Sequence, residues 1–160
     1  MFEEFFGSGA VDVGKGINIA ISLEKRGMEY YASNARNAGS TEGATLFRFL
    51  EGEERKHLKS LQELALARGG ESAGWADALA ASAPGLFRLE RGRGGGARAD
   101  ILGAAMETEK ASIEFYSKFA ERIEAPEGKR FFRALAGFEE THLALLSALM
   151  EKPHGGEARV

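Results

Sequence analysis

The chain has 160 residues, of which 44% are hydrophobic and 28% are charged. This composition is typical of a soluble globular protein and excludes a disordered or membrane-embedded chain. The 21 basic residues nearly balance the 24 acidic ones, so no overall positive field is present to bind nucleic acid. Cysteine is absent, which excludes disulfides, thiolate zinc sites and cysteine-ligated iron-sulfur or rubredoxin-type centres.

Neither a membrane span nor an export signal is expected. The longest strongly apolar stretch, residues 143–150, is far shorter than the roughly 20 residues that a span requires. The first six residues lack the basic start and long apolar run of a secretory signal. We therefore expect a cytoplasmic protein with one domain over residues 1–160, because a chain of this length can bury a single core.

The sequence contains an internal repeat. Residues 20–64 align without a gap onto residues 105–149 at an offset of 85, and 17 of the 45 positions are identical. Average composition would give roughly three identities. The two segments are therefore interpreted as copies of one unit.

The first copy predicts a helical hairpin over about residues 15–68. Apolar residues recur at steps of three and four on both sides of a break at residues 38–41. Ser40 or Thr41 would cap the second helix, because a hydroxyl oxygen there can accept a hydrogen bond from a free backbone amide.

Residues 69–100 separate the two copies and include Gly69, Gly70, Pro84 and an Arg/Gly-rich run at 91–96. This segment is too long for a tight turn, so it is interpreted as a crossover, with a possible short helix over residues 76–83. The basic cluster in it could dock an acidic electron-transfer partner or, as a weaker alternative, nucleic acid, or it could simply be a solvated surface. It consists of Arg88, Arg91, Arg93 and Arg98.

The second copy predicts another hairpin over about residues 101–151, with a break at residues 125–126. Pro126 suits the first turn of the last helix, where its missing N–H is not needed. Residues 151–160 are expected to be a solvated tail. The two hairpins together predict an all-α, antiparallel four-helix bundle. The Phe-rich N-terminus, with Phe2, Phe5 and Phe6, could cap this bundle or join a dimer contact.

Four glutamates lie on the apolar stripes of the predicted helices, where a surface residue is not expected. Burying an ion without compensation costs several kcal/mol, so carboxylates at these positions need cations or protons. The four are Glu24, Glu54, Glu109 and Glu139.

Two histidines, His57 and His142, follow Glu54 and Glu139 by three residues, which places each pair on one helical face. One Glu from each of two helices, with a Glu-x-x-His from each of the other two, is the ligand pattern of di-iron and di-manganese carboxylate proteins. Two divalent ions would also neutralise four carboxylates. The six residues therefore predict a site for two iron ions, with manganese or zinc as the alternatives.

Tyr31 and Tyr116 each follow a first-helix glutamate of the repeat by seven residues, about two turns along the same face. They are candidate catalytic residues that would donate a hydrogen bond or an electron near the metals. Packing in the core is an equally good interpretation. Gly52 and Gly137 also leave two interpretations, close helix approach or simple inheritance through the duplication.

The chain resembles the rubrerythrin branch of the ferritin-like superfamily over about residues 15–151. Four segments carry the resemblance: Ala-Ile-Ser-Leu-Glu-Lys leading to Tyr31, Glu-Glu-Arg-Lys-His-Leu at 53–58, Glu-Lys-Ala-Ser-Ile-Glu-Phe-Tyr at 109–116, and Phe-Glu-Glu-Thr-His-Leu at 138–143. The resemblance implies a non-haem di-iron centre, commonly in a homodimer. It also implies that Glu54 and Glu139 are bridging carboxylates.

Two departures from the rubrerythrin pattern bear on function. The chain has no cysteine for a rubredoxin domain, and Ser112 stands where rubrerythrins carry an extra glutamate. The leading hypothesis is an oxidoreductase that reduces peroxide or oxygen with an external electron donor. The alternative is a ferroxidase or iron-handling protein whose substrate is ferrous ion, because the six residues are also similar to the ferroxidase centre of bacterioferritin. A purely structural or sensory site is the third hypothesis.

Overall fold

The computed structural model of the chain describes residues 11–38, 40–67 and 98–152. These residues form four long helices and no strand, so the predicted all-helical fold class is confirmed. The helices are α2 (Val13–Asn37), α3 (Thr41–Ala67), α5 (Arg98–Arg122) and α6 (Pro126–Glu151).

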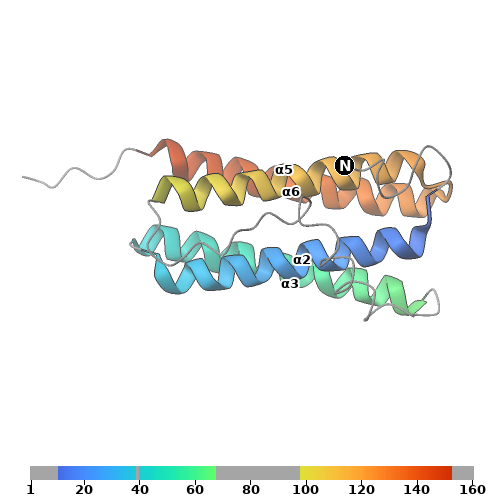
Figure 1. Cartoon of the computed structure of the whole chain (residues 1–160), viewed down its shortest axis with the longest axis horizontal. Coiled ribbons are helices and arrows are strands. Elements are labelled where there is room, and N and C mark those ends of the chain that lie inside the picture. The colour runs from blue at the N-terminus through green and yellow to red at the C-terminus, as the bar shows by residue number, and fades with distance from the viewer. Residues whose placement is uncertain (1–10, 39, 68–97, 153–160) are drawn as a thin grey trace, which may run out of the picture.

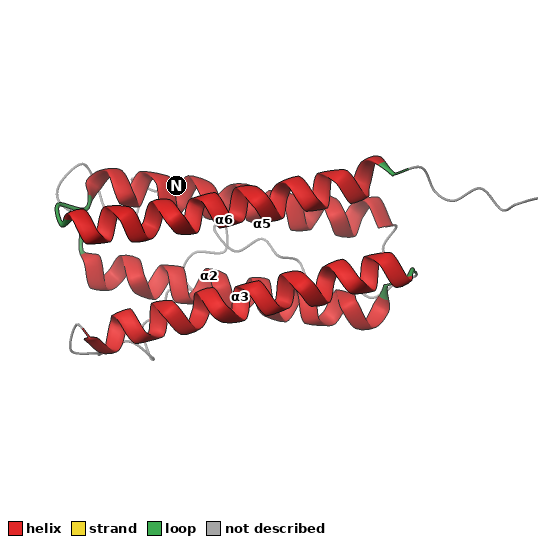
Figure 2. Ribbon diagram, turned by 180° about the vertical axis from the view of Figure 1, so that it is seen from behind, coloured by secondary structure: helices red, strands yellow, loops and turns green. Residues whose placement is uncertain are grey.

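The helices form two antiparallel hairpins that lie along each other. Helix α2 packs along α3, and α5 packs along α6. The interfaces between α2 and α5 and between α3 and α6 are much less extensive. Figures 1 and 2 view the molecule from opposite sides, and both show the two helix pairs lying lengthwise along each other. The end of α3 and the start of α5 lie at opposite ends of the bundle (Figure 1). The predicted crossover falls mainly on residues 68–97, which lie outside the described residues.

Local sequence explains where the helices begin. The Asp12 carboxylate accepts a hydrogen bond of 3.0 Å from the Lys15 backbone amide and caps α2. Ser40 is the residue that caps α3, because its hydroxyl accepts a bond of 3.1 Å from the Gly43 amide. Helix α6 begins at Pro126, as predicted from the break before it.

The apolar core is divided into two clusters with a polar layer between them. One cluster contains Ile17, Leu61, Phe119 and Phe132, and the other contains Tyr30, Leu50, Leu102 and Leu146. Along every helix, the buried glutamate lies between residues of the first cluster and residues of the second. Each fully buried large side chain stabilises the fold by about 1.5–3 kcal/mol. The two clusters therefore fix the helices on both sides of the polar layer.

Glycine allows the closest helix approach, which is between α2 and a ring of α5. A Cβ atom at Gly16 would lie 1.9 Å from Cζ of Phe119, so a larger residue there would force the helix or the ring to shift. The close-approach interpretation of Gly52 and Gly137 is wrong, because no atom of another described helix lies within 4 Å of a Cβ built at either position.

Several sequence predictions fall on residues that the structure does not describe. These are the Phe-rich N-terminus, the short helix over 76–83, Arg88, Arg91, Arg93 and the end of the tail. Arg98 is the first residue of α5. In the part of the chain that is described, no helix combines the length and apolar character that a membrane crossing requires.

Candidate metal centre

The six residues predicted as metal ligands meet in the polar layer of the bundle. Every helix contributes one glutamate, and α3 and α6 each add a histidine one turn later. All six are buried, with exposed fractions between 1% and 6%. They are Glu24, Glu54, His57, Glu109, Glu139 and His142. The three-residue spacing read from the sequence thus places each Glu and its His on the inner face of one helix.

Each histidine lies among three of the carboxylates. The contacts of one histidine involve the repeat equivalents of the residues that contact the other. Nδ1 of His57 lies 3.3 Å from Glu139, 3.4 Å from Glu24 and 3.6 Å from Glu54. Nδ1 of His142 lies 3.1 Å from Glu54, 4.0 Å from Glu109 and 2.9 Å from Glu139. The His57–Glu139 pair becomes His142–Glu54 when the repeats are exchanged. The imidazole rings stack 5.5 Å apart.

Two groups of four ligand atoms can each hold a metal ion. One comprises Glu24, Glu54, His57 and Glu139, and the other Glu54, Glu109, Glu139 and His142. In each group one ligand atom from every residue lies within 4.8 Å of the others. Glu54 and Glu139 belong to both groups, which is the arrangement that two carboxylates bridging a metal pair require.

Part of the donor set has no hydrogen-bond partner among the residues that the structure describes. Oε2 of Glu24, Nδ1 of His57 and Oε1 of Glu139 are buried without one. An unpaired buried polar atom costs about 1–3 kcal/mol, more when charged. Two divalent cations would satisfy these atoms and neutralise the four carboxylates, so the residues fit a metal pair with oxygen and nitrogen ligands.

Without metal, the layer retains protons. Burial, with the nearby Glu139 charge, raises the pKa of Glu54 and Glu109 well above 4.5. Burial alone would lower the pKa of both histidines, but the surrounding carboxylates outweigh it and raise the pKa of His57 to about 11 and that of His142 above 6.5. Burial opposes ionisation of Glu139, yet the two histidines lower its pKa to about 2. Protonation of these groups thus offsets part of the negative charge that cations would otherwise neutralise.

Tyr31 and Tyr116 connect the hairpins at the edge of this layer. The Tyr31 hydroxyl donates to Oε1 of Glu109, and the Tyr116 hydroxyl donates to Oε1 of Glu24 at 2.5 Å. Both rings are also core residues, stacked or tilted against Phe47 and Phe132 at 6.0 Å. Each tyrosine therefore both packs in the core and donates a hydrogen bond to the glutamate of the other repeat.

Replacing Tyr31 or Tyr116 with phenylalanine should lower the free energy of unfolding of the metal-free protein by about 1–3 kcal/mol, because a buried carboxyl oxygen then loses its hydrogen-bond donor. Tyr30→Phe is the matched control, because the Tyr30 hydroxyl donates to the neutral backbone oxygen of Ile101 at 2.7 Å. Urea denaturation of the three variants would measure the losses. A loss in Tyr30→Phe larger than in both others would contradict this assignment.

The sequence interpretation missed two residues beside the layer. Glu53 forms a third possible ligand group with His57 and His142. Gly27 lies against Glu54, since a Cβ built there would be 3.4 Å from Cγ and Cδ of that side chain. No sequence signal singled out Glu53, because most positions of the repeat differ between the two copies.

The second hairpin also matches a known family. Residues 100–160 match the family model of rubrerythrin. This part of the chain is similar to rubrerythrin. The match covers nearly all of α5 and the whole of α6, with Glu109, Glu139 and His142, and the internal repeat extends the same pattern to α2 and α3. No curated protein matches the chain. The family match of the second hairpin and the geometry of the buried residues together support a metal-binding helical bundle.

Proposed function

We propose that the protein is a non-haem di-iron oxidoreductase that reduces peroxide or oxygen with electrons from an external donor. The observation that carries the proposal is the pair of buried four-residue groups that share Glu54 and Glu139. A single structural ion would need only one such group. Two adjacent ions with common carboxylates can change charge together, which suits a two-electron reaction.

In this proposal Glu54 and Glu139 bridge the two ions. Glu24 and His57 complete one position, and Glu109 and His142 complete the other. Support comes from the distances, since Nδ1 of each histidine lies within 4.0 Å of the glutamate proposed as its co-ligand. Nδ1 is therefore the proposed ligand atom of both histidines. Manganese and zinc remain the alternatives to iron.

The bound ferrous pair would supply two electrons and Lewis acidity for cleavage of an O–O bond. The protein residues would orient the ligands and exclude water. Tyr31 and Tyr116 fix the carboxylates of Glu109 and Glu24 by donating hydrogen bonds to them. Burial, with the charge of Glu109 or Glu24, raises the pKa of each phenol well above 10, so both hydroxyls hold their protons at neutral pH. Either could donate that proton to a reduced oxygen atom.

An external reductant completes the proposal, because this chain contains no cysteine for a rubredoxin-type centre. We propose a small electron-transfer protein as the donor, a homodimer as the assembly and the cytoplasm as the location. A ferroxidase or iron-handling role is the second candidate. It is favoured by Ser112, which is buried one turn beyond Glu109 and leaves the layer with four carboxylates and two histidines among the described residues.

Stopped-flow oxidation of the anaerobically reduced protein distinguishes these roles. If the protein is a peroxide reductase, hydrogen peroxide should oxidise the ferrous pair faster than oxygen does. Steady turnover should then require an added reductase, because the chain supplies only the two electrons of its metal pair. The change in absorption of the ferric product would report both rates.

The two candidates differ in how the protein behaves after the first oxidation. Faster reaction with oxygen, together with continued iron uptake beyond two ions per chain, would support iron handling and contradict the peroxidase role. Failure of both oxidants to react would contradict both roles and leave a structural or sensory site. A protein with Glu54 and Glu139 both replaced by glutamine is the control for oxidation of free ferrous ion.

A further inference from the structure

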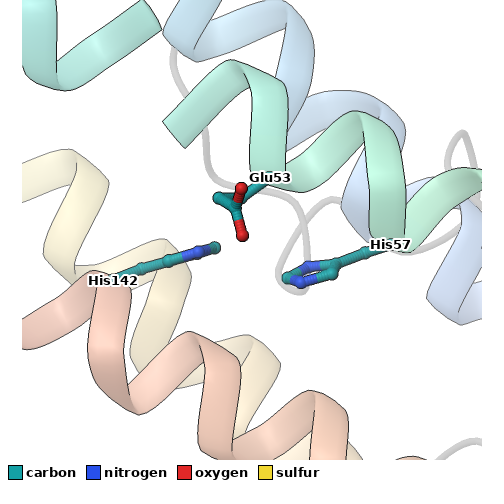
Figure 3. Close-up of side chains that lie close together, drawn as sticks. All are labelled: Glu53, His57 and His142. Atoms are coloured by element: carbon teal, nitrogen blue, oxygen red, sulfur yellow. The ribbon is translucent and has the colours of Figure 1, made fainter. Parts of the chain in front are cut away.

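A third group of possible ligand atoms lies at one side of the buried layer. Glu53 of α3 joins His57 and His142, and one ligand atom from each residue lies within 4.8 Å of the other two. Figure 3 shows the Glu53 carboxylate directed between the two imidazole rings. Glu53 belongs to neither of the two inner groups.

Solvent reaches this group through Glu53. The side chain of Glu53 is 23% exposed, whereas His57 and His142 are 7% and 3% exposed. Of the seven residues in the three ligand groups found among the described residues, Glu53 is the only one that is not buried. A cation that approaches from water can therefore meet this carboxylate before it meets an inner ligand.

Glu53 differs from the inner ligands in having no equivalent acidic residue in the other copy of the repeat. The six inner residues form three equivalent pairs, but the counterpart of Glu53 is Phe138. Phe138 is half exposed, and its ring stacks on His57 with centroids 5.2 Å apart. The first repeat thus places a carboxylate beside the histidines, whereas the second repeat places an apolar ring there.

We propose that Glu53, His57 and His142 form an entry position that takes a divalent transition-metal ion from solution and transfers it to the inner groups. This inference rests on the proposed two-metal function. A carboxylate with two imidazoles suits ferrous iron, manganese or zinc. Because both histidines also belong to inner groups, an ion held here can exchange Glu53 for an inner carboxylate without returning to water.

The charges make this position a transient one. The four inner glutamates already neutralise two divalent ions, and Glu53 adds only one negative charge. Its present partner is Lys56, whose side chain is 73% exposed. Such an exposed ion pair contributes only about 0–1 kcal/mol, so an arriving cation can displace the ammonium group.

The test is the rate at which cobalt(II) loads the metal-free, full-length protein, followed by the visible absorption of the bound ion. Glu53→Gln keeps the size of the side chain and removes its charge. Loading should slow by at least about tenfold, as expected when an electrostatic approach is removed. Release to excess chelator should slow by the same factor, because an entry position lies on both paths. Stoichiometry and affinity should therefore stay unchanged.

The chain offers a closely matched control in Glu51→Gln. Glu51 lies on the same helix, has a side chain 24% exposed and pairs with Arg55 in the next turn. It belongs to none of the ligand groups, so this variant should load cobalt at the wild-type rate. Glu53→Asp, which restores the charge on a shorter side chain, should recover part of the lost rate.

Two results would overturn the proposal. One is wild-type loading by Glu53→Gln, and the other is a loss of equilibrium affinity with an unchanged loading rate, which would make Glu53 only a positioning residue for the histidines. Failure of the two-metal function gives a different result. In that case the wild-type protein itself would not bind two cobalt ions per chain.

Discussion

If the proposed two-metal centre is correct, replacing Glu139 with glutamine should reduce the metal content from two ions per chain to one or none. Glu139 is 1% exposed and belongs to both inner ligand groups, so its loss removes a ligand from both positions at once. The metal-free variant should also lose about 3–5 kcal/mol of unfolding free energy, the usual cost of removing one partner of a buried ion pair. Here the remaining partners are the two imidazoles. Elemental analysis and urea denaturation would measure the two effects.

Glu140→Gln is the control for this variant. Glu140 is the next residue of α6, is exposed and belongs to none of the ligand groups. Its replacement should leave metal content and stability close to those of the wild type. Two ions bound to Glu139→Gln with wild-type affinity would contradict the bridging assignment.

Metal loading should reverse the dependence of stability on pH. In the metal-free protein, the folded-state pKa of His57 is raised from 6.5 to about 11, so its contribution to stability is complete below 6.5 and is lost as pH rises toward 11. His142, Glu54 and Glu109 also have raised pKa values and act in the same direction. Glu139 acts oppositely, but only as pH falls through about 2. Metal-free protein should therefore become less stable above pH 6.5.

In the loaded protein the ligands must be deprotonated, so metal affinity rises with pH. Each ion at 100 times its dissociation constant adds about 2.7 kcal/mol to the free energy of unfolding. Thermal denaturation between about pH 6 and pH 9, with excess chelator or with anaerobic ferrous ion, would measure both curves. His57→Gln should flatten the metal-free curve. A metal-free protein that gains stability over this range would contradict the proton assignment.

Much of this bundle could be predicted from sequence because its signals are local and repeated. The spacing of Glu54 from His57 fixes a common helical face, and the repeat doubles that evidence. The break before Thr41 and Pro126 at the start of α6 mark where helices begin. Such features depend on neighbouring residues and on simple geometry, so no knowledge of the tertiary contacts was needed.

Contacts between hairpins could not be predicted in the same way. Periodicity placed Tyr31 on the inner face, but it could not show that its hydroxyl reaches Glu109, 78 residues away. Glu53 looks like an ordinary surface residue of α3, since the group it forms depends on how closely α6 brings His142. For the glycines, one interpretation of the sequence was wrong. Gly52 and Gly137 suggested close helix approach, which is instead found at Gly16.

Anaerobic titration of the metal-free protein with ferrous ion, followed by elemental analysis of the product, tests the proposed metal pair most directly. The shared positions of Glu54 and Glu139 predict an end point of two ions per chain, and His57→Ala and His142→Ala should each lower it. An end point of zero ions in the wild-type protein, or of a single ion unaffected by either histidine variant, would contradict a two-metal centre in this layer.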